Sequence, residues 1–171
     1  MTTYEAATAT RSRTHTWEAR PEPTPELLET TGREVPQGAI DGRFPEASIM
    51  STLGFRLVEV GDGRAVFEGD PGDHLLNPMG TVHGGFLATL LDSALGSAVM
   101  SRLPAGSAYT TVQLGVHLIR PVLPGAAALR CEGVALHVGR TTATAEARVT
   151  GAADGKLYAH GTTTCAVLRT G

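Results

Sequence analysis

Four residues between positions 77 and 92 could act together on a polar ligand: Asn77, His83, Gly84 and Asp92. Asp92 is the single charged residue of a long apolar segment, and an unpaired carboxylate in apolar surroundings carries a large desolvation cost. It must therefore face a polar cleft, pair with an arginine or a neighbouring loop, or take part in chemistry. Gly84 and Gly85 leave first-turn amides open to a ligand, and a helix N-terminus favours negative charge. A tight turn before a helix would use the same glycine pair.

The segment from Val82 to Met100 predicts the helix that must position these groups. Its apolar residues are joined by small ones with hardly any polar face, and a helix that is apolar all round is a buried helix. The rise from His83 to Asp92 along such a helix is about 13 Å, whereas a base and an oxyanion donor must each lie about 3 Å from one reacting centre. If both groups are catalytic, the spacing therefore predicts an obligate two-fold dimer in which each of two equivalent sites takes groups from both chains.

Composition narrows the class of protein further. The chain has 171 residues, which is enough for one domain and an extension, and its formal net charge is -3 without a run of lysine or arginine. We therefore expect no nucleic-acid partner and no membrane-surface partner. We see no signal peptide and no membrane span, which makes the cytoplasm the expected location. Cys131 and Cys165 are expected to be free thiols. The histidines lack ligand-like spacing, so no metal site is expected at His74, His83, His117, His137 or His160.

The first 46 residues form a predicted N-terminal extension, because five of the ten prolines and the only tryptophan, Trp17, lie there. We expect the first twenty residues to be disordered. A short helix is predicted over 24–32, where Thr24 can cap, Pro25 occupies the first turn and Gly32 can terminate. Residues 47–171 are then the single folded domain.

Proline, glycine and turn residues divide that domain into predicted helices and strands. A short helix over 47–53 precedes strands at 55–60 and 64–68, which the turn Gly61-Asp62-Gly63 joins as a hairpin. Four further strands are predicted after the long helix, at 108–120, 126–138, 140–150 and 156–168. In the first of these, apolar residues at 112, 114, 116 and 118 alternate with Thr111, Gln113, Gly115 and His117. This two-residue period predicts a half-buried antiparallel sheet. The small residues on the buried faces suit a curved sheet that wraps around a central helix, so we expect an α+β fold.

The motif Asn-Pro-x-Gly-x-x-His-Gly-Gly, with an acidic residue nine positions after the histidine, resembles the hotdog-fold acyl-CoA thioesterases. The nearest likeness is to the PaaI-like group, with relatives that act on phenylacetyl-CoA and 4-hydroxybenzoyl-CoA. It spans about residues 48–168 and includes Arg120-Pro121 and Gly139-Arg140-Thr141. The resemblance implies a hotdog fold that dimerises into a continuous sheet, in a homodimer or a homotetramer.

Matched by position, the resemblance implies that Asp92 is the acidic catalyst and that the Gly84 amide polarises the substrate carbonyl. It also implies site roles for Asn77 and His83, whose ordinary roles would be a turn residue and a helix-entrance hydrogen bond. A water-orienting hydroxyl falls on Thr111, with Thr110 as the neighbouring option. In some relatives another hydroxyl lies one turn beyond the acid, where this chain has Gly96.

The residues agree with thioester chemistry. A thioester carbonyl is already electrophilic, so one amide and one carboxylate can suffice without a serine nucleophile, a metal or a cofactor. Asp92 could activate water as a general base or attack the carbonyl itself. Coenzyme A is part of the substrate, and arginines suit its phosphates. The candidates for this contact are Arg120, Arg140 with Gly139 in its turn, and Arg148.

Two other functions stay open. The same fold could serve as a non-catalytic acyl-CoA-binding protein, although the acidic residue argues against that. A hotdog enoyl-CoA hydratase would use aspartate, Asn-Pro and histidine close together, which Asp73, Asn77 and His83 superficially match.

Overall fold

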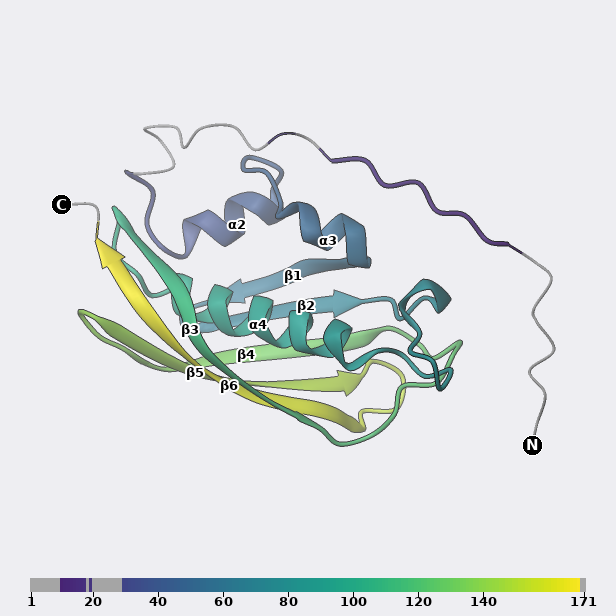
Figure 1. The fold of residues 1–171 in the computed structure, drawn as a ribbon. Helices are drawn as coiled ribbons and strands as arrows, with labels where there is room; N and C mark the ends of the chain where they lie inside the picture. The colour runs from purple at the N-terminus through teal and green to yellow at the C-terminus, as the bar shows by residue number, and fades with distance from the viewer. Residues whose placement is uncertain (1–9, 18, 20–28, 170–171) are drawn as a thin grey trace.

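A single six-stranded antiparallel sheet is the framework of the chain in the computed structural model, which describes residues 10–17, 19 and 29–169. The strand order is β1-β2-β4-β5-β6-β3, so β1 and β3 are the edge strands of the described sheet. The sheet curls around helix α4 (Gly84–Met100), which lies against its concave face (Figure 1). The strands are β1 Phe55–Gly61, β2 Arg64–Gly69, β3 Ser107–Leu118, β4 Leu129–Val138, β5 Thr142–Gly151 and β6 Leu157–Arg169.

The predicted α+β architecture is confirmed: all six strands, α3 (Ser48–Leu53) and α4 lie where the sequence pattern places them, with ends shifted by a few residues. Two short helices were not predicted, α2 (Glu34–Ile40) and η1 (Asp73–Leu75). None of the helices in the described part of the chain is both long and apolar enough to cross a membrane.

The segment before residue 47 packs against the sheet and the end of α4. Most of the helix predicted over 24–32 lies outside the described residues, which resume at Glu29. Glu29 is helical, whereas Thr30 is not. The Gly32 amide then donates to the carbonyl of Leu103 at 2.9 Å. Helix α2 follows along β1 and buries Pro36 and Gly38 (Figure 1). Residues 10–17 also touch the domain, since Arg11 forms an ion pair with Asp73 of η1.

Glycines of the sheet face helix α4 and let it pack closely against the strands. A Cβ on Gly133 would lie 2.4 Å from the carbonyl oxygen of Ala94, and a Cβ on Gly161 would lie 3.3 Å from Leu91 Cδ1. Any side chain at Gly133 would therefore push α4 off β4. The helix contributes the centre of the core at this contact, since Leu90, Leu91 and Leu95 are fully buried.

A β-bulge in β3 changes which residues face α4. The register with β6 slips between Thr111 and Gln113, so one extra residue is inserted and the side-chain alternation shifts. Tyr109 before the bulge and Leu114 and Val116 after it pack against the core, while Val112 is 61% exposed. The prediction that Val112 shares a buried face with Leu114 is wrong for this reason.

Both cysteines are free, as predicted, and the structure shows that both are buried. Burial raises the pKa of the Cys131 thiol above its ordinary value, with a smaller contribution from the neighbouring Glu132 carboxylate. A thiol in this state is a weak nucleophile at neutral pH, so Cys131 acts as a small core side chain.

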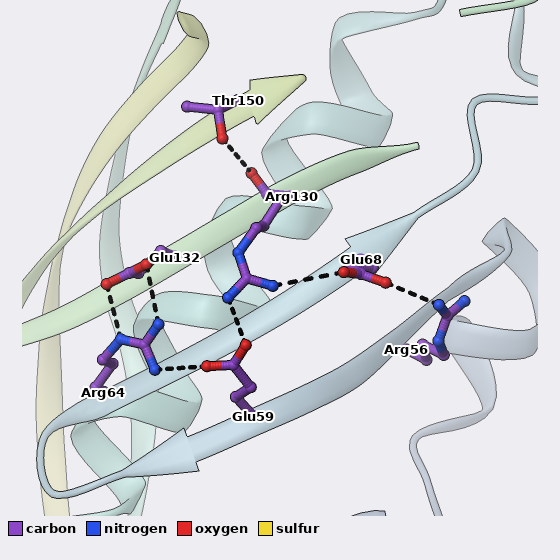
Figure 2. A network of polar contacts seen from close by, with 7 residues as sticks. All are labelled: Arg56, Glu59, Arg64, Glu68, Arg130, Glu132 and Thr150. Atoms are coloured by element: carbon purple, nitrogen blue, oxygen red, sulfur yellow. Dashed lines mark hydrogen bonds and ion pairs between the residues drawn. The ribbon is translucent and has the colours of Figure 1, made fainter. Parts of the chain in front are cut away.

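The outer face of β1, β2 and β4 carries a network of alternating charges (Figure 2). Arg64 donates to both oxygens of Glu132, at 2.8 and 3.1 Å, and to Glu59 at 2.9 Å. Arg130 bridges Glu59 to the next carboxylate along the network, Glu68. Val66 lies in register between Glu59 and Glu132 and is fully buried beneath these charges. The network therefore ties the β1 edge to the interior of the sheet.

This network gives a stability that depends on pH. Hydrogen bonds from Arg130 and Arg64 lower the pKa of Glu59, and those from Arg64 lower the pKa of Glu132, from the ordinary value of 4.5. Carboxyls whose pKa is lower in the folded chain stabilise it above about pH 4.5 and lose that contribution as the pH falls through the folded pKa.

We predict that Glu132→Gln lowers the free energy of unfolding at neutral pH by at most about 1 kcal/mol, because the pair is partly exposed. The loss should shrink at an acidic pH below the lowered pKa of Glu132, where the wild-type carboxyl is protonated too. Urea unfolding at both pH values measures it, with Glu146→Gln at an exposed position of β5 as the control that should change little. An equal loss at both pH values would contradict the charge-based origin.

Candidate active site

The entrance of α4 is built by His83 and Gly84. His83 is the N-cap residue, and its Nδ1 accepts a hydrogen bond from the Gly85 amide at 2.9 Å, so the expected helix-entrance bond is present. This geometry requires Nδ1 to carry no proton. Gly84 is the first helical residue, and a Cβ there would lie 2.5 Å from Leu118 Cδ1. The glycine therefore allows β3 to close against the helix end while the first-turn amides stay unobstructed by a side chain.

Asn77 holds the turn that leads into this entrance. Its Oδ1 accepts from the amides of Met79 and Thr81 at 2.9 and 3.2 Å, and its Nδ2 donates to Thr81 Oγ1 at 2.8 Å. The side chain is thus committed to the structure of its own loop. It still borders a pocket of about 220 Å³ next to Gly84.

That pocket brings three of the predicted site residues together: Asn77, Gly84 and Arg120. The Arg120 guanidinium donates to the carbonyl of Leu157 at 2.7 Å and is otherwise exposed. Apolar side chains that include Leu87, Leu118 and Val122 complete the lining. The pocket therefore combines the first residue of the helix, Gly84, with a cation and an apolar wall.

Asp92 and Thr111 form a second cluster, deeper along the helix. Thr111 Oγ1 donates to Asp92 Oδ1 at 3.0 Å, and both side chains are half-buried. No hydrogen bond within the described residues engages the other oxygen of Asp92. The bulge turns Thr111 toward the helix, whereas Thr110 is exposed, so Thr111 and not Thr110 supplies the hydroxyl. The arrangement leaves one carboxylate oxygen available to act on a ligand or a water.

Two neighbours of this cluster were not identified from the sequence, Tyr109 and Cys165. Cys165 lies opposite Thr111 in the β3–β6 register, and burial raises the pKa of its thiol. Burial likewise raises the pKa of the Tyr109 phenol, with smaller contributions from Cys165 and Asp92. The signal that could have found Tyr109 is its position two residues before Thr111 on the same strand face.

Other predicted residues lie apart from these clusters. Gly139 and Arg140 occupy the β4–β5 turn, where the Gly139 amide donates to Thr142 at 2.9 Å and Arg140 is exposed. This turn adjoins Val167, whose partner in β3 is Tyr109, so it lies toward the C-terminal half of α4 and away from Arg120. Arg148 faces His160 on the sheet. One chain therefore does not gather the predicted coenzyme A contacts at a single place.

The residues of the hydratase alternative are also engaged elsewhere. Asp73 forms its ion pair with Arg11, and Asn77 and His83 bond within their own turns. The described residues thus contain no Asp73–His83 pair. The two clusters that do form, at Gly84 and at Asp92, are separated by about 12 Å along one helix.

The fold and these clusters define a class: a hotdog fold, with a glycine-rich entrance and one carboxylate on the central helix. The thioesterase superfamily model matches residues 79–158. A Halobacterium salinarum protein whose name refers to esterase activity is 34% identical over 120 residues, which cover 67% of this chain and 78% of that protein.

Solved structures agree with this class. A mutant of the phenylacetic acid degradation protein PaaI from Thermus thermophilus is 32% identical with a TM-score of 0.64, over 70% of this chain and 98% of that chain. A phenylacetic acid degradation-related protein from Ralstonia eutropha is 28% identical with a TM-score of 0.69, over 77% and 98%. The chain belongs to the thioesterase superfamily, with PaaI-like proteins among its structural relatives.

We predict that His83→Ala lowers the free energy of unfolding by about 1 kcal/mol, because the Gly85 amide loses its cap. His83→Asn keeps a side-chain acceptor at the N-cap and should restore most of that loss. Urea unfolding of the two variants and the wild type measures the difference. Equal destabilisation by Ala and Asn would show that the cap bond is not what His83 contributes.

Proposed function

We propose that the protein hydrolyses acyl-CoA thioesters to a free acid and coenzyme A. The observation that carries this proposal is the Asp92 carboxylate. It is held by Thr111 through one oxygen, its other oxygen accepts no hydrogen bond from the described residues, and it lies on an otherwise apolar helix. Membership of the thioesterase superfamily supports the same reaction class. Water adds to the thioester carbonyl carbon, the carbon–sulfur bond breaks, and coenzyme A leaves as the thiol with the remaining proton.

The roles divide between the two clusters. The Gly84 amide, at the positive end of α4, stabilises the negative charge that develops on the carbonyl oxygen. Asp92 either takes the proton from the attacking water or attacks the carbonyl itself to form an anhydride. Hydroxylamine distinguishes these two routes, because it converts an anhydride on Asp92 to a hydroxamate that mass spectrometry detects.

A complete site requires two chains in this proposal. Gly84 and Asp92 are fixed about 12 Å apart by the helix, which is too far for one carbonyl to reach both. The β3 edge supports a two-fold partner, because the side of β3 that faces away from β6 has no partner strand in the described sheet, and Val112 and Leu118 are 61% and 56% exposed. Pairing β3 with a partner's β3 would give a continuous sheet, in a homodimer or in a tetramer made from two such dimers.

The same dimer offers a role for the coenzyme A candidates. Arg120 borders the Gly84 pocket, whereas Arg140 and the Gly139 turn lie toward the opposite end of α4. In the proposed site, Arg120 comes from the chain that supplies Gly84, and Arg140 comes from the chain that supplies Asp92. Their guanidinium groups suit the phosphates of the nucleotide.

We predict that Asp92→Asn lowers kcat for acyl-CoA hydrolysis at least about 100-fold while the fold is retained, because the general base or nucleophile is lost. Thiol release across aromatic, short-chain and medium-chain acyl-CoAs measures it, with Asp154→Asn in the distant β5–β6 hairpin as the control. Near-normal activity of the Asp92 variant would end the proposed mechanism.

The same assay distinguishes the alternatives. Binding of acyl-CoA without thiol release from any substrate would favour the non-catalytic binding protein. Loss of the conjugated double bond of crotonyl-CoA without thiol release would favour a hydratase.

A mixing experiment tests whether sites are shared between chains. Gly84→Pro removes the first-turn amide at a position where proline suits a helix, and His83 already has the extended backbone that precedes proline (φ -64°, ψ 135°). Gly84→Ala adds a Cβ but keeps the amide, so it is the matched control. Homodimers of the Gly84→Pro or the Asp92→Asn chain should both be inactive.

Refolding the two inactive chains together should restore activity. Each mixed dimer contains one site with an intact Gly84 and an intact Asp92, so random mixing should recover about a quarter of wild-type activity. Sites contained within single chains would give no recovery, and that result would contradict the shared site.

A further inference from the structure

Tyr109 reaches from β3 to the backbone of α4, one helical turn beyond Asp92. A Cβ on Gly96 would lie 2.1 Å from Tyr109 Oη and 2.7 Å from its Cζ, so no residue other than glycine leaves room for the phenol there. Gly96 is four residues after Asp92 and therefore lies on the same side of the helix. Tyr109 and Thr111 are two residues apart on β3, before the bulge, and so lie on one strand face, which is directed toward α4. The phenol oxygen thus occupies the space next to the Asp92–Thr111 cluster.

The half-buried Tyr109 makes no hydrogen bond through its hydroxyl within the part of the chain that the structure describes, and the hydroxyl oxygen is not closed off from solvent. The hydroxyl can therefore reach a water or a ligand beside the cluster. Burial, then Cys165 and then Asp92 raise the pKa of the phenol. The group is therefore protonated at neutral pH and close enough to Asp92 to feel its charge.

Thr111 engages only one oxygen of the neighbouring carboxylate. It donates to Oδ1 of Asp92, while the other carboxylate oxygen accepts no hydrogen bond from the described residues. A water between that oxygen and Tyr109 Oη could donate one hydrogen to each. Its lone pair would then be free to face the substrate carbonyl, which is the orientation that attack requires.

We infer that Tyr109 is a further residue of the Asp92 half of the active site, whose hydroxyl holds the attacking water against Asp92. Gly96 is its positioning partner, because the absence of a side chain there lets the phenol reach this place. This inference rests on the proposed thioesterase function. Tyr109 would then supply a hydroxyl one helical turn beyond Asp92, where the helix residue itself, Gly96, has none.

The test compares Tyr109→Phe with the wild type in the thiol-release assay. Phenylalanine keeps the ring over Gly96 and removes only the oxygen, so the fold should persist. We expect kcat to fall about 10- to 100-fold with KM changed less than about twofold, because the water is misplaced while substrate binding is not. The matched control is Tyr158→Phe, which removes a hydroxyl that bonds Asp154 at 3.2 Å and should leave kcat unchanged.

A second variant tests the partner. Gly96→Ala displaces the phenol and should lower kcat to a similar extent in the wild type. Added to Tyr109→Phe it should lower kcat little further, because the hydroxyl is already absent. Unfolding curves confirm that each variant is folded, and kcat is taken per folded chain.

The outcomes separate the inference from the function on which it rests. If wild-type and Tyr109→Phe chains share the same kcat, the role of Tyr109 falls and the thioesterase function stands. A change confined to KM would also overturn the inference, since it would make Tyr109 a wall of the acyl pocket. A wild-type chain that releases thiol from no acyl-CoA would remove both proposals.

Discussion

The hydrogen bond between Thr111 and Asp92 is the contact on which the arrangement of this molecule depends. A carboxylate on a buried helix must be satisfied by something outside the helix, and here the sheet supplies the donor at 3.0 Å. The donor points inward because β3 carries a bulge at this position. Without the extra residue, either Thr111 or the apolar residues Leu114 and Val116 would face away from α4. The bulge thus allows one strand to direct both its polar hydroxyl and its apolar side chains toward α4.

The bond also requires that α4 lie close to the sheet, since threonine is short. Glycines set that distance from both sides. Gly133 and Gly161 let the helix backbone and Leu91 approach the strands, and Gly96 receives the Tyr109 ring. Each has a neighbour that a Cβ would meet at 3.3 Å or less. These glycines therefore set the distance between α4 and the sheet, and the fully buried leucines of α4 fill the space between the two layers.

The sequence patterns predicted the elements well and the irregularities poorly. Strand ends follow from proline and glycine breakers, and an apolar helix with one charge is visible directly. The bulge was missed because strict alternation at 111–118 gives no sign of an inserted residue, and this misplaced Val112. Helix α2 was missed because it contains Pro36 and Gly38, although Pro36 sits in the first turn, where amides need no helical partner. Tyr109 was missed because its place depends on Gly96, thirteen positions earlier.

The rigidity of α4 has a consequence for how such a site can work. A helix holds Gly84 and Asp92 at a separation that side-chain motion cannot close, so neither group can meet a shared carbonyl by local adjustment. Gly84 and Asp92 can act on one carbonyl only when each comes from a different chain. In the proposed dimer, the edge strand β3 sets where the partner's helix lies. The strand that orients Thr111 and Tyr109 toward Asp92 is also an edge strand of the described sheet. In the proposed dimer, assembly and the geometry of the carboxylate would therefore be determined by the same twelve residues, Ser107–Leu118.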